Sequence, residues 1–356
     1  MKHVLLKILN VALLLAIVAC VKDPFPGGGD SELEPVPPTD TTTTPPPDTT
    51  IINDFFFGVN GHPLNQEAYA TLSAPEQMLL LKSLGMNIYR VDFTVTSQGK
   101  IIPKQRFETL REAATASNIT ILPMLPDAKL DYNSSEDVAY RQGYDRGYGF
   151  AQENGNYFTF YNIGNELDND CILPNKSGKI VEHYDQKKFK IIAAHLKGMD
   201  EGIKAVDKDA KTMINASWMH YKYLQMLEQY GINYDIVAYH WYSDMESAAV
   251  SAYQINDITE FLTKQFDKPI WLTEINIRNK NGKISEESQR DFLNTVIAKC
   301  QKNPGVQAVI IYELFNQPVF NSIESYYGLF DWEQPYKKYK AKLWASEQTT
   351  KTSKGG

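Results

Sequence analysis

The chain of 356 residues is 43% hydrophobic and 12% aromatic, which is enough for one large core or two smaller domains. This composition excludes collagen, a coiled coil or a chain disordered over most of its length, and three cysteines are too few for a disulfide-built scaffold. The 36 basic and 43 acidic side chains give a formal net charge of −7, which repels phosphate backbones, so no nucleic-acid partner is expected.

The first 20 residues have the features of an export signal. Basic residues precede an apolar stretch of nine residues, 11–19, whereas a membrane span needs roughly 20. The tetrad 17–20 resembles the lipobox of bacterial lipoproteins. This resemblance implies a signal peptide over 1–19 and a lipid on the sulfur of Cys20, which would anchor the protein to a membrane. An ordinary signal peptide with a coincidental cysteine is the alternative.

Residues 20–53 are predicted to form an extended tether. The part that follows Cys20 contains eight of the chain's 18 prolines, and it cannot bury enough apolar surface to offset the entropy lost on ordering. In polyproline geometry it can hold a domain up to roughly 100 Å from a membrane. Its acidic, Gly-rich start resembles outer-membrane lipoproteins of Bacteroidetes-type bacteria, which implies exposure at the cell surface. A periplasmic-facing anchor stays open.

From Phe55 onward, β-branched or aromatic runs alternate with stretches of helical periodicity. Their mean spacing of about 36 residues suits one strand, one helix and their loops. Eight such units predict an α/β fold, a single (β/α)8 TIM barrel over 54–346, followed by a disordered tail over 347–356. An open doubly wound sheet is the alternative, but no Gly-x-Gly-x-x-Gly follows any run. The predicted strands are 55–60, 87–95, 119–125, 157–164, 211–216, 235–242, 269–275 and 306–315.

In such a barrel, chemistry lies at the C-terminal ends of the strands. The fourth predicted strand ends in Asn165-Glu166 and the seventh in Glu274, both after apolar runs. Burying a carboxylate is costly unless the group is used or paired, so these two mark a candidate site. Rim residues held in salt bridges are the alternative. Trp271 has the opposite parity to Glu274 and is expected to pack between the barrel and its helices.

Asn165-Glu166 and Glu274 on strands four and seven resemble the signature of clan A glycoside hydrolases, the four/seven barrel superfamily that includes families 5 and 39. The resemblance covers the whole barrel and extends to Tyr239-His-Trp-Tyr242 and Tyr327-Gly-Leu-Phe-Asp331. It implies a retaining β-glycosidase, more narrowly an endo-acting glycanase, that hydrolyses a β-linked polysaccharide or oligosaccharide. The motifs identify the clan but not a family within it.

The resemblance implies that Glu166 is the general acid/base and Glu274 the nucleophile. A retaining mechanism needs two carboxyl groups roughly 5–5.5 Å apart, one protonated and one ionised. Burial and mutual repulsion are expected to raise the pKa of Glu166. By the same resemblance, Asn165 binds the sugar 2-hydroxyl and Arg90 pairs with the nucleophile. Asp92 is the weaker candidate and could instead hold Arg90 in a structural ion pair.

His240 and Tyr242 share a parity on strand six, so both are expected to point inward. The resemblance implies that such a group orients the nucleophile, while a structural role for His240 stays open. Glu313 stands where many clan relatives carry a tryptophan, and either Glu313 or Tyr312 can point inward, but not both. Aromatic side chains after strands five and eight are candidates for stacking on sugar faces, namely Trp218 and Trp332.

No cofactor or metal is expected. The six histidines form no His-x-His pair, no Cys/His spacing resembles a zinc site, and no Gly-x-Ser-x-Gly marks a serine hydrolase. Cys171 and Cys300 are predicted to be free thiols at opposite ends of the barrel, with Cys171 the more reactive.

Two other functions stay open beside the glycosidase. One is a non-catalytic, cell-surface glycan-binding lipoprotein on a degenerate barrel, and the other is an unrelated barrel enzyme that uses the same carboxylates. The expected partners are a β-linked glycan, the membrane and other surface proteins of glycan utilisation.

Overall fold

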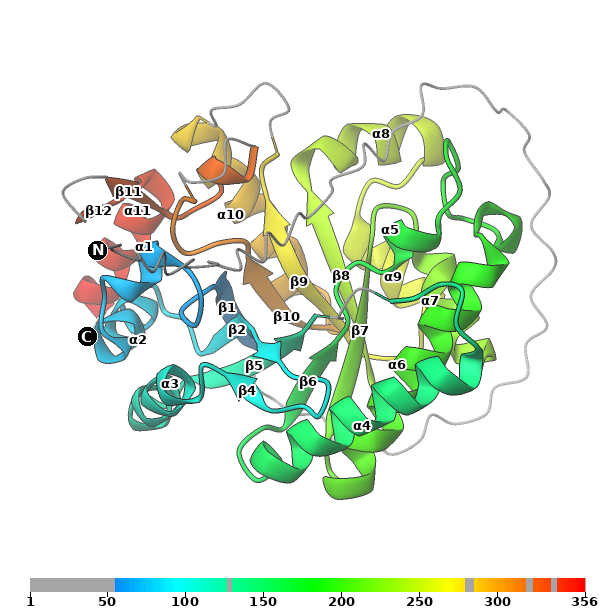
Figure 1. The fold of residues 1–356 in the computed structure, drawn as a ribbon. Helices are drawn as coiled ribbons and strands as arrows, with labels where there is room; N and C mark the ends of the chain where they lie inside the picture. Colours follow the sequence, from blue (N-terminus) through cyan, green and yellow to red (C-terminus); the bar gives the residue numbers. More distant parts are fainter. Residues whose placement is uncertain (1–54, 127–129, 279–284, 318–322, 334–337, 356) are drawn as a thin grey trace, which may run out of the picture.

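The computed structural model describes residues 55–126, 130–278, 285–317, 323–333 and 338–355. The predicted signal peptide, the tether and Cys20 lie outside the described residues. Eight parallel strands close into a barrel in the order β1–β10–β9–β8–β7–β6–β5–β2, and helices surround it (Figure 1). The predicted (β/α)8 barrel is therefore confirmed.

Every predicted strand range overlaps one barrel strand. Most residues of these strands are buried, on both faces of the sheet, as expected for a parallel barrel covered by helices. The barrel strands are β1 (Phe56–Gly61), β2 (Ile88–Asp92), β5 (Thr120–Leu125), β6 (Phe160–Ile163), β7 (Lys211–Ser217), β8 (Ile236–Tyr242), β9 (Ile270–Asn276) and β10 (Val306–Ile311). Two short hairpins lie outside the barrel, β3 (Thr94–Val95) with β4 (Ile101–Ile102), and β11 (Phe330–Glu333) with β12 (Lys338–Ala341).

The helices begin at side-chain caps in several places. Ser73 forms a capping box with Glu76, and Ser135, Asp185 and Ser285 each accept a hydrogen bond from a backbone N–H of the first turn. The helices are α1 (Glu67–Ala70), α2 (Ala74–Ser83), α3 (Lys104–Ala116), α4 (Glu136–Asn154), α5 (Asp168–Cys171), α6 (Gln186–Val206), α7 (Tyr221–Gln229), α8 (Ser243–Tyr253), α9 (Ile258–Gln265), α10 (Glu286–Lys302) and α11 (Leu343–Gly355). Among the described residues, no helix combines the length and apolar character needed to cross a membrane.

Helix α11 shows that the predicted disordered tail over 347–356 was wrong. Its first turn buries Trp344, whose ring lies 6.1 Å from that of Phe57 and whose Nε1 donates to Asn294 Oδ1 at 3.0 Å. This anchored turn nucleates the helix, which can then propagate through the polar residues that follow. Figure 1 shows α11 beside α10 and α2, with which it is in contact.

Trp271 also differs from its prediction. Its ring lies in the barrel interior, 5.1 Å from Phe56 and 4.7 Å from Phe160. Strict alternation would then turn Glu274 outward, but the register shifts on β9. Tyr239 of β8 pairs with Leu272 while the next residue, His240, pairs with Glu274, so one extra residue is inserted. This bulge lets both Trp271 and Glu274 point inward.

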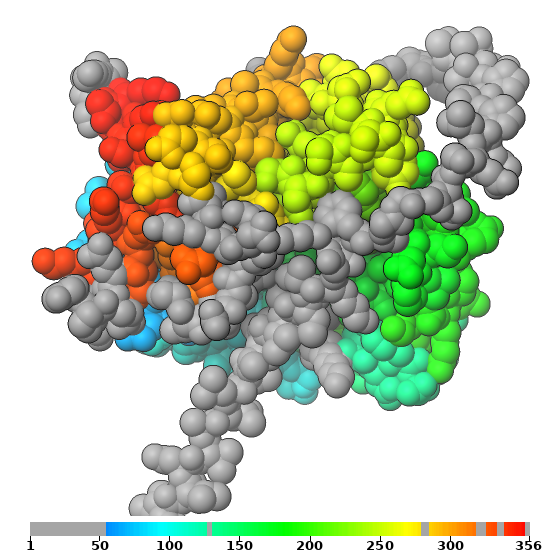
Figure 2. Space-filling model, turned by 90° about the horizontal axis from the view of Figure 1, so that it is seen from above, coloured from blue at the N-terminus to red at the C-terminus, as the bar shows by residue number. Residues whose placement is uncertain are grey.

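Figure 2 shows the sequence colours passing around the molecule in order, so that the first and last described parts of the barrel lie side by side.

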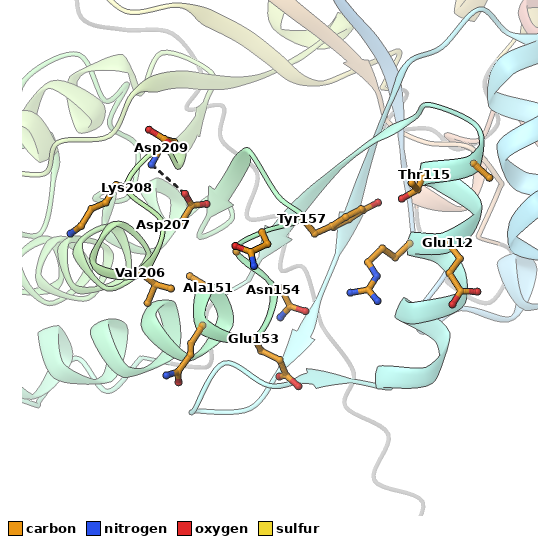
Figure 3. Close-up of a pocket in the computed structure, with 15 residues that line it drawn as sticks. Glu112, Thr115, Ala151, Glu153, Asn154, Tyr157, Val206, Asp207, Lys208 and Asp209 are labelled. Carbon is orange, nitrogen blue, oxygen red and sulfur yellow. Dashed lines mark hydrogen bonds between the residues drawn. The ribbon is translucent and has the colours of Figure 1, made fainter.

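A hollow of about 1020 Å³ opens at the N-terminal end of the barrel, between the C-terminal ends of α3, α4 and α6 (Figure 3). Tyr157, Asn154 and Asp207 are among the residues that line it. It lies at the opposite end from the strand-end carboxylates.

Candidate active site

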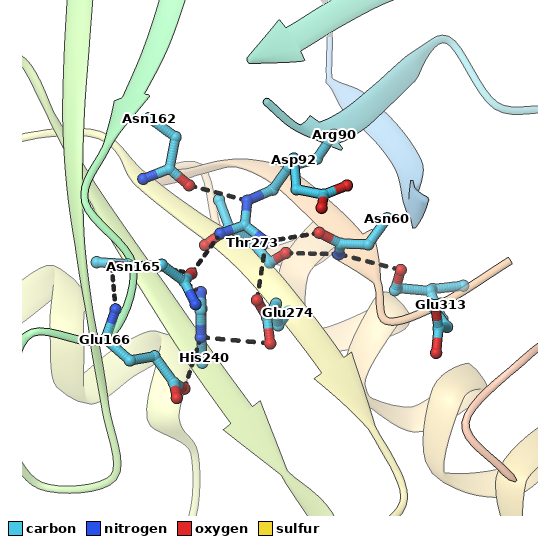
Figure 4. A network of polar contacts seen from close by, with 12 residues as sticks. Asn60, Arg90, Asp92, Asn162, Asn165, Glu166, His240, Thr273, Glu274 and Glu313 are labelled. Carbon is cyan, nitrogen blue, oxygen red and sulfur yellow. Dashed lines mark hydrogen bonds and ion pairs between the residues drawn. The ribbon is translucent and has the colours of Figure 1, made fainter. Parts of the chain in front are cut away.

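The predicted catalytic carboxylates meet at the mouth of the barrel, formed by the C-terminal ends of its strands. Glu166 follows β6, Glu274 lies on β9, and His240 of β8 stands between them (Figure 4). His240 Nδ1 is 2.8 Å from Glu166 Oε1 and 3.4 Å from Glu274 Oε2. An oxygen of each carboxylate and one ring nitrogen all lie within 4.8 Å of one another.

Two donors hold Glu274. Arg90 Nη1 donates to Oε1 at 2.8 Å, and the hydroxyl of Tyr242 donates to Oε2 at 2.8 Å. Burial and the nearby Glu274 raise the pKa of Tyr242 well above its usual value, so the hydroxyl keeps the proton that it donates. The carboxylate side chain is 9% exposed, so it is fixed in orientation and nearly dry. The structure thus brings together three residues that were singled out from the sequence.

Arg90 also links the strands around Glu274. Its Nε donates to Asn162 at 2.8 Å, Nη1 also donates to Asn60 at 2.6 Å, and Nη2 donates to Asn165 at 2.9 Å. Every nitrogen of this buried guanidinium therefore has an acceptor. Asn60 and Asn162 were not singled out from the sequence, because a lone asparagine within a buried strand has no diagnostic spacing.

Asp92 does not pair with Arg90, so that alternative is wrong. It lies two residues farther along β2, about 6.6 Å higher in the barrel. There it contacts His62 Nδ1 at 2.8 Å and accepts from Asn65 at 2.7 Å. Arg90 thus remains available to Glu274.

The proton on His240 is fixed by Asn215 of β7, which sequence reasoning missed. Asn215 Oδ1 accepts from the backbone N–H of Glu166 at 3.0 Å, so its Nδ2 faces His240 Nε2 at 2.8 Å and Asn165 Oδ1 at 3.0 Å. Since Nε2 accepts, the ring proton resides on Nδ1, which donates to Glu166. The one signal for Asn215 in the sequence is an amide within an otherwise apolar strand.

Glu166 sits on a sharp bend at the end of β6. Gly164 has φ of 73° and Glu166 itself has φ of 50°, a left-handed conformation that is uncommon outside glycine and often occurs at functional sites. The bend turns the side chain back over the mouth, where it is 30% exposed. Its Oε2 accepts from Asn169 at 3.3 Å.

The predicted rise in the pKa of Glu166 is not observed. Burial does act to raise it, but the hydrogen bond from His240 and the charges of Arg278 and Arg90 outweigh burial and lower the pKa. The prediction considered only burial and the second carboxylate. It omitted the donors that the fold brings to the same place.

Of the neighbours Tyr312 and Glu313, Glu313 is fully buried away from the catalytic pair. It lies 3.1 Å from His62 Nε2 and accepts from Tyr69 at 3.2 Å. Tyr312 is half-buried, and its ring lies 5.8 Å from that of Tyr327. Tyr327 in turn packs at 5.6 Å on Tyr242, the partner of Glu274. Tyr312 is therefore the member of this pair that lies beside the site.

Neither predicted tryptophan presents a ring face to a sugar. Trp218 is 3% exposed and stacks on Trp241 at 6.3 Å, behind β8. Trp332, on the hairpin strand β11, is 6% exposed. Both belong to the core between the barrel and its surroundings, so these two predictions were wrong. Large apolar rings at strand ends are as useful for packing as for binding.

Glu166, His240 and Glu274 have the residue types that bind a metal ion. A ligating imidazole nitrogen must be unprotonated. Here Nε2 accepts from Asn215, and Nδ1 carries the proton that faces the carboxylates. This arrangement suits hydrogen bonding and proton transfer rather than metal binding.

Both remaining cysteines are free, as predicted. Cys171 is fully buried on α5, and burial raises the pKa of its thiol well above the usual value. Cys300 is likewise fully buried, on α10, and burial raises the pKa of its thiol. The expectation that Cys171 is reactive is therefore wrong, because α5 folds its thiol inward.

Comparison with known proteins gives a family and a fold. The family model described as glycosyl hydrolase catalytic core matches residues 111–331. The chain resembles the family 1 β-glucosidase from Thermotoga maritima with a TM-score of 0.62 and 11% identity, over 85% of this chain and 98% of that one. It resembles the β-glycosidase BGL167 with a TM-score of 0.59 and 14% identity, over 85% and 97%. No curated protein sequence matches the chain.

Proposed function

Since the chain belongs to the glycosyl hydrolase catalytic core family and is a glycoside hydrolase, we propose that it is a retaining β-glycosidase. Glu274 is the nucleophile and Glu166 the general acid/base. The observation that carries this assignment is that one carboxylate oxygen of Glu166 and one of Glu274 lie within 4.8 Å of each other at the ends of β6 and β9. An inverting enzyme needs a wider gap, roughly 6.5–9.5 Å, to admit a water molecule.

In the first step, Glu274 attacks the anomeric carbon and Glu166 gives its proton to the departing oxygen. Arg90 and Tyr242 hold the attacking carboxylate. Asn165 is held by Arg90 and Asn215, and it presents its amide to the sugar 2-hydroxyl. These contacts are made before substrate arrives, so little reorganisation is required during the reaction.

In the second step, water attacks the covalent glycosyl-enzyme and Glu166 acts as its base. A lowered pKa of Glu166 suits this step. For the first step Glu166 must be protonated, and a bound sugar favours this by removing water from its 30% exposed side chain. The hydrogen bond from His240 thus keeps the pKa of Glu166 low enough for its role as base, while substrate binding raises it for its role as acid.

The substrate is a β-linked glycan, and the clan resemblance favours endo-acting cleavage of a polymer. The names of the structural neighbours, β-glucosidase and β-glycosidase, make exo-acting removal of a terminal sugar the second candidate. The sizes of the products separate the two, because an endo-acting enzyme releases intermediate oligosaccharides early and an exo-acting enzyme releases a single small sugar throughout.

The test is hydrolysis of β-glucans, mannans, xylans and galactans, with the anomeric configuration of the first product followed by proton NMR. The proposal predicts that the β-anomer appears first. Appearance of the α-anomer first would mean inversion. Binding without hydrolysis, on polymers and on activated aryl β-glycosides, would instead indicate the non-catalytic glycan-binding protein.

The location of the enzyme is part of the same proposal. A lipid on Cys20 anchors the domain to the outer membrane, and the tether over 20–53 lets it reach glycans and other surface proteins outside the cell. Wild type should enter the detergent phase on partitioning with Triton X-114 and be removed from intact cells by protease. Cys20→Ala should move to the aqueous phase. Partitioning of both proteins into the aqueous phase would exclude the anchor.

A further inference from the structure

A second buried arginine lies at the mouth of the barrel. Arg278 follows β9 by two residues, and its side chain is 10% exposed. The guanidinium carbon lies 4.1 Å from the ring centroid of Tyr242, which donates to Glu274. This cation is therefore separated from the catalytic nucleophile by one aromatic ring.

Arg278 differs from Arg90 in that its guanidinium, among the described residues, has an ion pair with Asp244 but no hydrogen-bond acceptor. Within the described part of the chain, its guanidinium makes no hydrogen bond, and its Nε is buried without a partner. Asp244 Oδ2 forms an ion pair with Nη1 at 3.8 Å, a separation beyond hydrogen-bond distance, so this pair leaves the N–H donors of Arg278 unused. Arg90, in the same mouth, uses all its nitrogens. A buried guanidinium with unused donors is costly, and native proteins retain few such groups without a functional reason.

The geometry of the Arg278 guanidinium indicates which chemical group would accept its unused hydrogen bonds. A guanidinium offers a planar fork of N–H groups that matches a carboxylate or a sulfate with two parallel hydrogen bonds. Its position beside Tyr242 and the catalytic pair places that acceptor on a sugar next to the scissile bond. The overall charge of −7 opposes the approach of an anion only weakly, because charges farther than about 8 Å are screened at physiological salt.

We propose that Arg278 binds a carboxylate or sulfate group of the substrate, so that the enzyme acts on an acidic β-glycan. This inference rests on the proposed glycosidase function. It also accounts for a cation placed beside a catalytic acid. The charge of Arg278 contributes to the lowered pKa of Glu166 in the free enzyme, against the effect of burial. A substrate anion that neutralises Arg278 restores the pKa of Glu166 upward when the acid is needed.

The experiment uses matched polymers that differ only in charge. A uronic-acid-bearing β-glycan is compared with the same polymer after carboxyl reduction, and a sulfated β-galactan with its desulfated form. Wild type should show a kcat/KM at least tenfold higher on one charged member than on its neutral match, about 1.4 kcal/mol. The pair that shows the preference identifies the anion as carboxylate or sulfate.

Variants then assign the preference to Arg278. Arg278→Gln should bring the charged-to-neutral ratio of kcat/KM close to one, and Arg278→Lys should keep part of the preference. Arg111→Gln, a change of the same kind at the opposite end of the barrel, should leave the ratio unchanged. No preference in wild type, or equal loss on both polymers in Arg278→Gln, overturns the proposal.

Failure of this inference is distinguishable from failure of the proposed function. Calorimetric binding of oligosaccharides from each polymer to the Glu166→Gln protein needs no turnover. Binding selective for the charged oligosaccharides and lost in Glu166→Gln/Arg278→Gln supports the anion site even if no glycan is hydrolysed. Hydrolysis of neutral glycans with no charge preference in binding or rate leaves the glycosidase intact and rejects the anion site.

Discussion

His240 donates its Nδ1 proton to Glu166 across 2.8 Å, and the same nitrogen lies 3.4 Å from Glu274. One imidazole therefore contacts both members of the catalytic pair, and Asn215 at Nε2 leaves the Nδ1 proton on the side that faces them. Donation stabilises the ionised form of Glu166 and opposes the effect of burial on its pKa. His240 is a positioning residue, and its removal should change the pH dependence of kcat/KM.

His240→Leu should shift the basic limb of the pH profile of kcat/KM to higher pH. This limb reports deprotonation of the acid in the free enzyme. Loss of a hydrogen bond that favours the charged form raises the pKa of Glu166. His240→Gln, which can still donate, should shift less. Identical limbs in wild type and His240→Leu would show that the imidazole does not control the acid.

Glu166→Gln should lose most activity on substrates with poor leaving groups and keep more on activated aryl β-glycosides. An activated leaving group departs without a proton, so only the second step is impaired. Added azide should then accelerate turnover and give a product of retained configuration. Glu112→Gln at the opposite end of the barrel is the matched control. Equal losses on both substrates, without an accumulating intermediate, count against the assignment.

The contact of His62 with Asp92 and Glu313 should make stability depend on pH. Burial disfavours the charged imidazole, but these two carboxylates raise the pKa of His62 well above its usual value. A group with a raised pKa stabilises the fold below its unfolded pKa, about 6.5, and this contribution is lost as the pH rises through the folded value. The free energy of unfolding should therefore fall above pH 6.5 in wild type.

Urea unfolding of wild type and His62→Gln between pH 5.5 and 9.5 checks this expectation. The difference between the two proteins should be largest at the acid end and shrink as the pH increases. A constant difference across the range would mean that the imidazole of His62 is not charged in the folded protein.

Cys171 and Cys300 should be detected as two free thiols in the denatured, unreduced domain that follows Cys20, and as none in the native domain. Both side chains are fully buried, and burial raises the pKa of each thiol, so neither is a nucleophile when folded. Thiol counting with and without denaturant measures this directly. Finding no thiol after denaturation would require a disulfide that the fold does not allow.

The sequence predicted the barrel because hydrophobic runs at a regular spacing are a property of the whole chain. It predicted Glu166, Glu274 and Arg90 because charged residues within apolar strands are conspicuous. It could not predict the bulge near Glu274, since an inserted residue in β9 leaves no mark in composition, and parity therefore misplaced Trp271. Asn215 was missed for a related reason. Its role depends on contacts with residues 49 and 25 positions away.

The aromatic predictions failed for a different physical reason. A ring that stacks on sugar and a ring that packs behind a strand have the same chemistry, and only the path of the chain decides between them. Trp218 follows β7 directly, yet its φ of 53° accompanies a turn that takes the ring to Trp241. The sequence shows which residues are aromatic, but it does not show whether a ring packs into the core or faces the active site.

The loss of the nucleophile should be the most severe single change. Glu274→Ala should abolish turnover, and azide rescue should give only a product of inverted configuration, because attack then comes from the vacated face. A variant that keeps a tenth of the wild-type rate would remove Glu274 from this role. Glu313 cannot replace it, since that side chain is fully buried outside the catalytic pair.

Trapping of the covalent intermediate tests the double-displacement assignment most directly. Incubation with an activated 2-deoxy-2-fluoro aryl β-glycoside of the sugar identified by the hydrolysis screen slows the second step more than the first. Mass spectrometry should then show one fluoroglycosyl group per protein, and peptide analysis should locate it on the carboxylate of Glu274. An enzyme that hydrolyses the parent glycoside but forms no adduct, or forms it on another residue, would contradict the account.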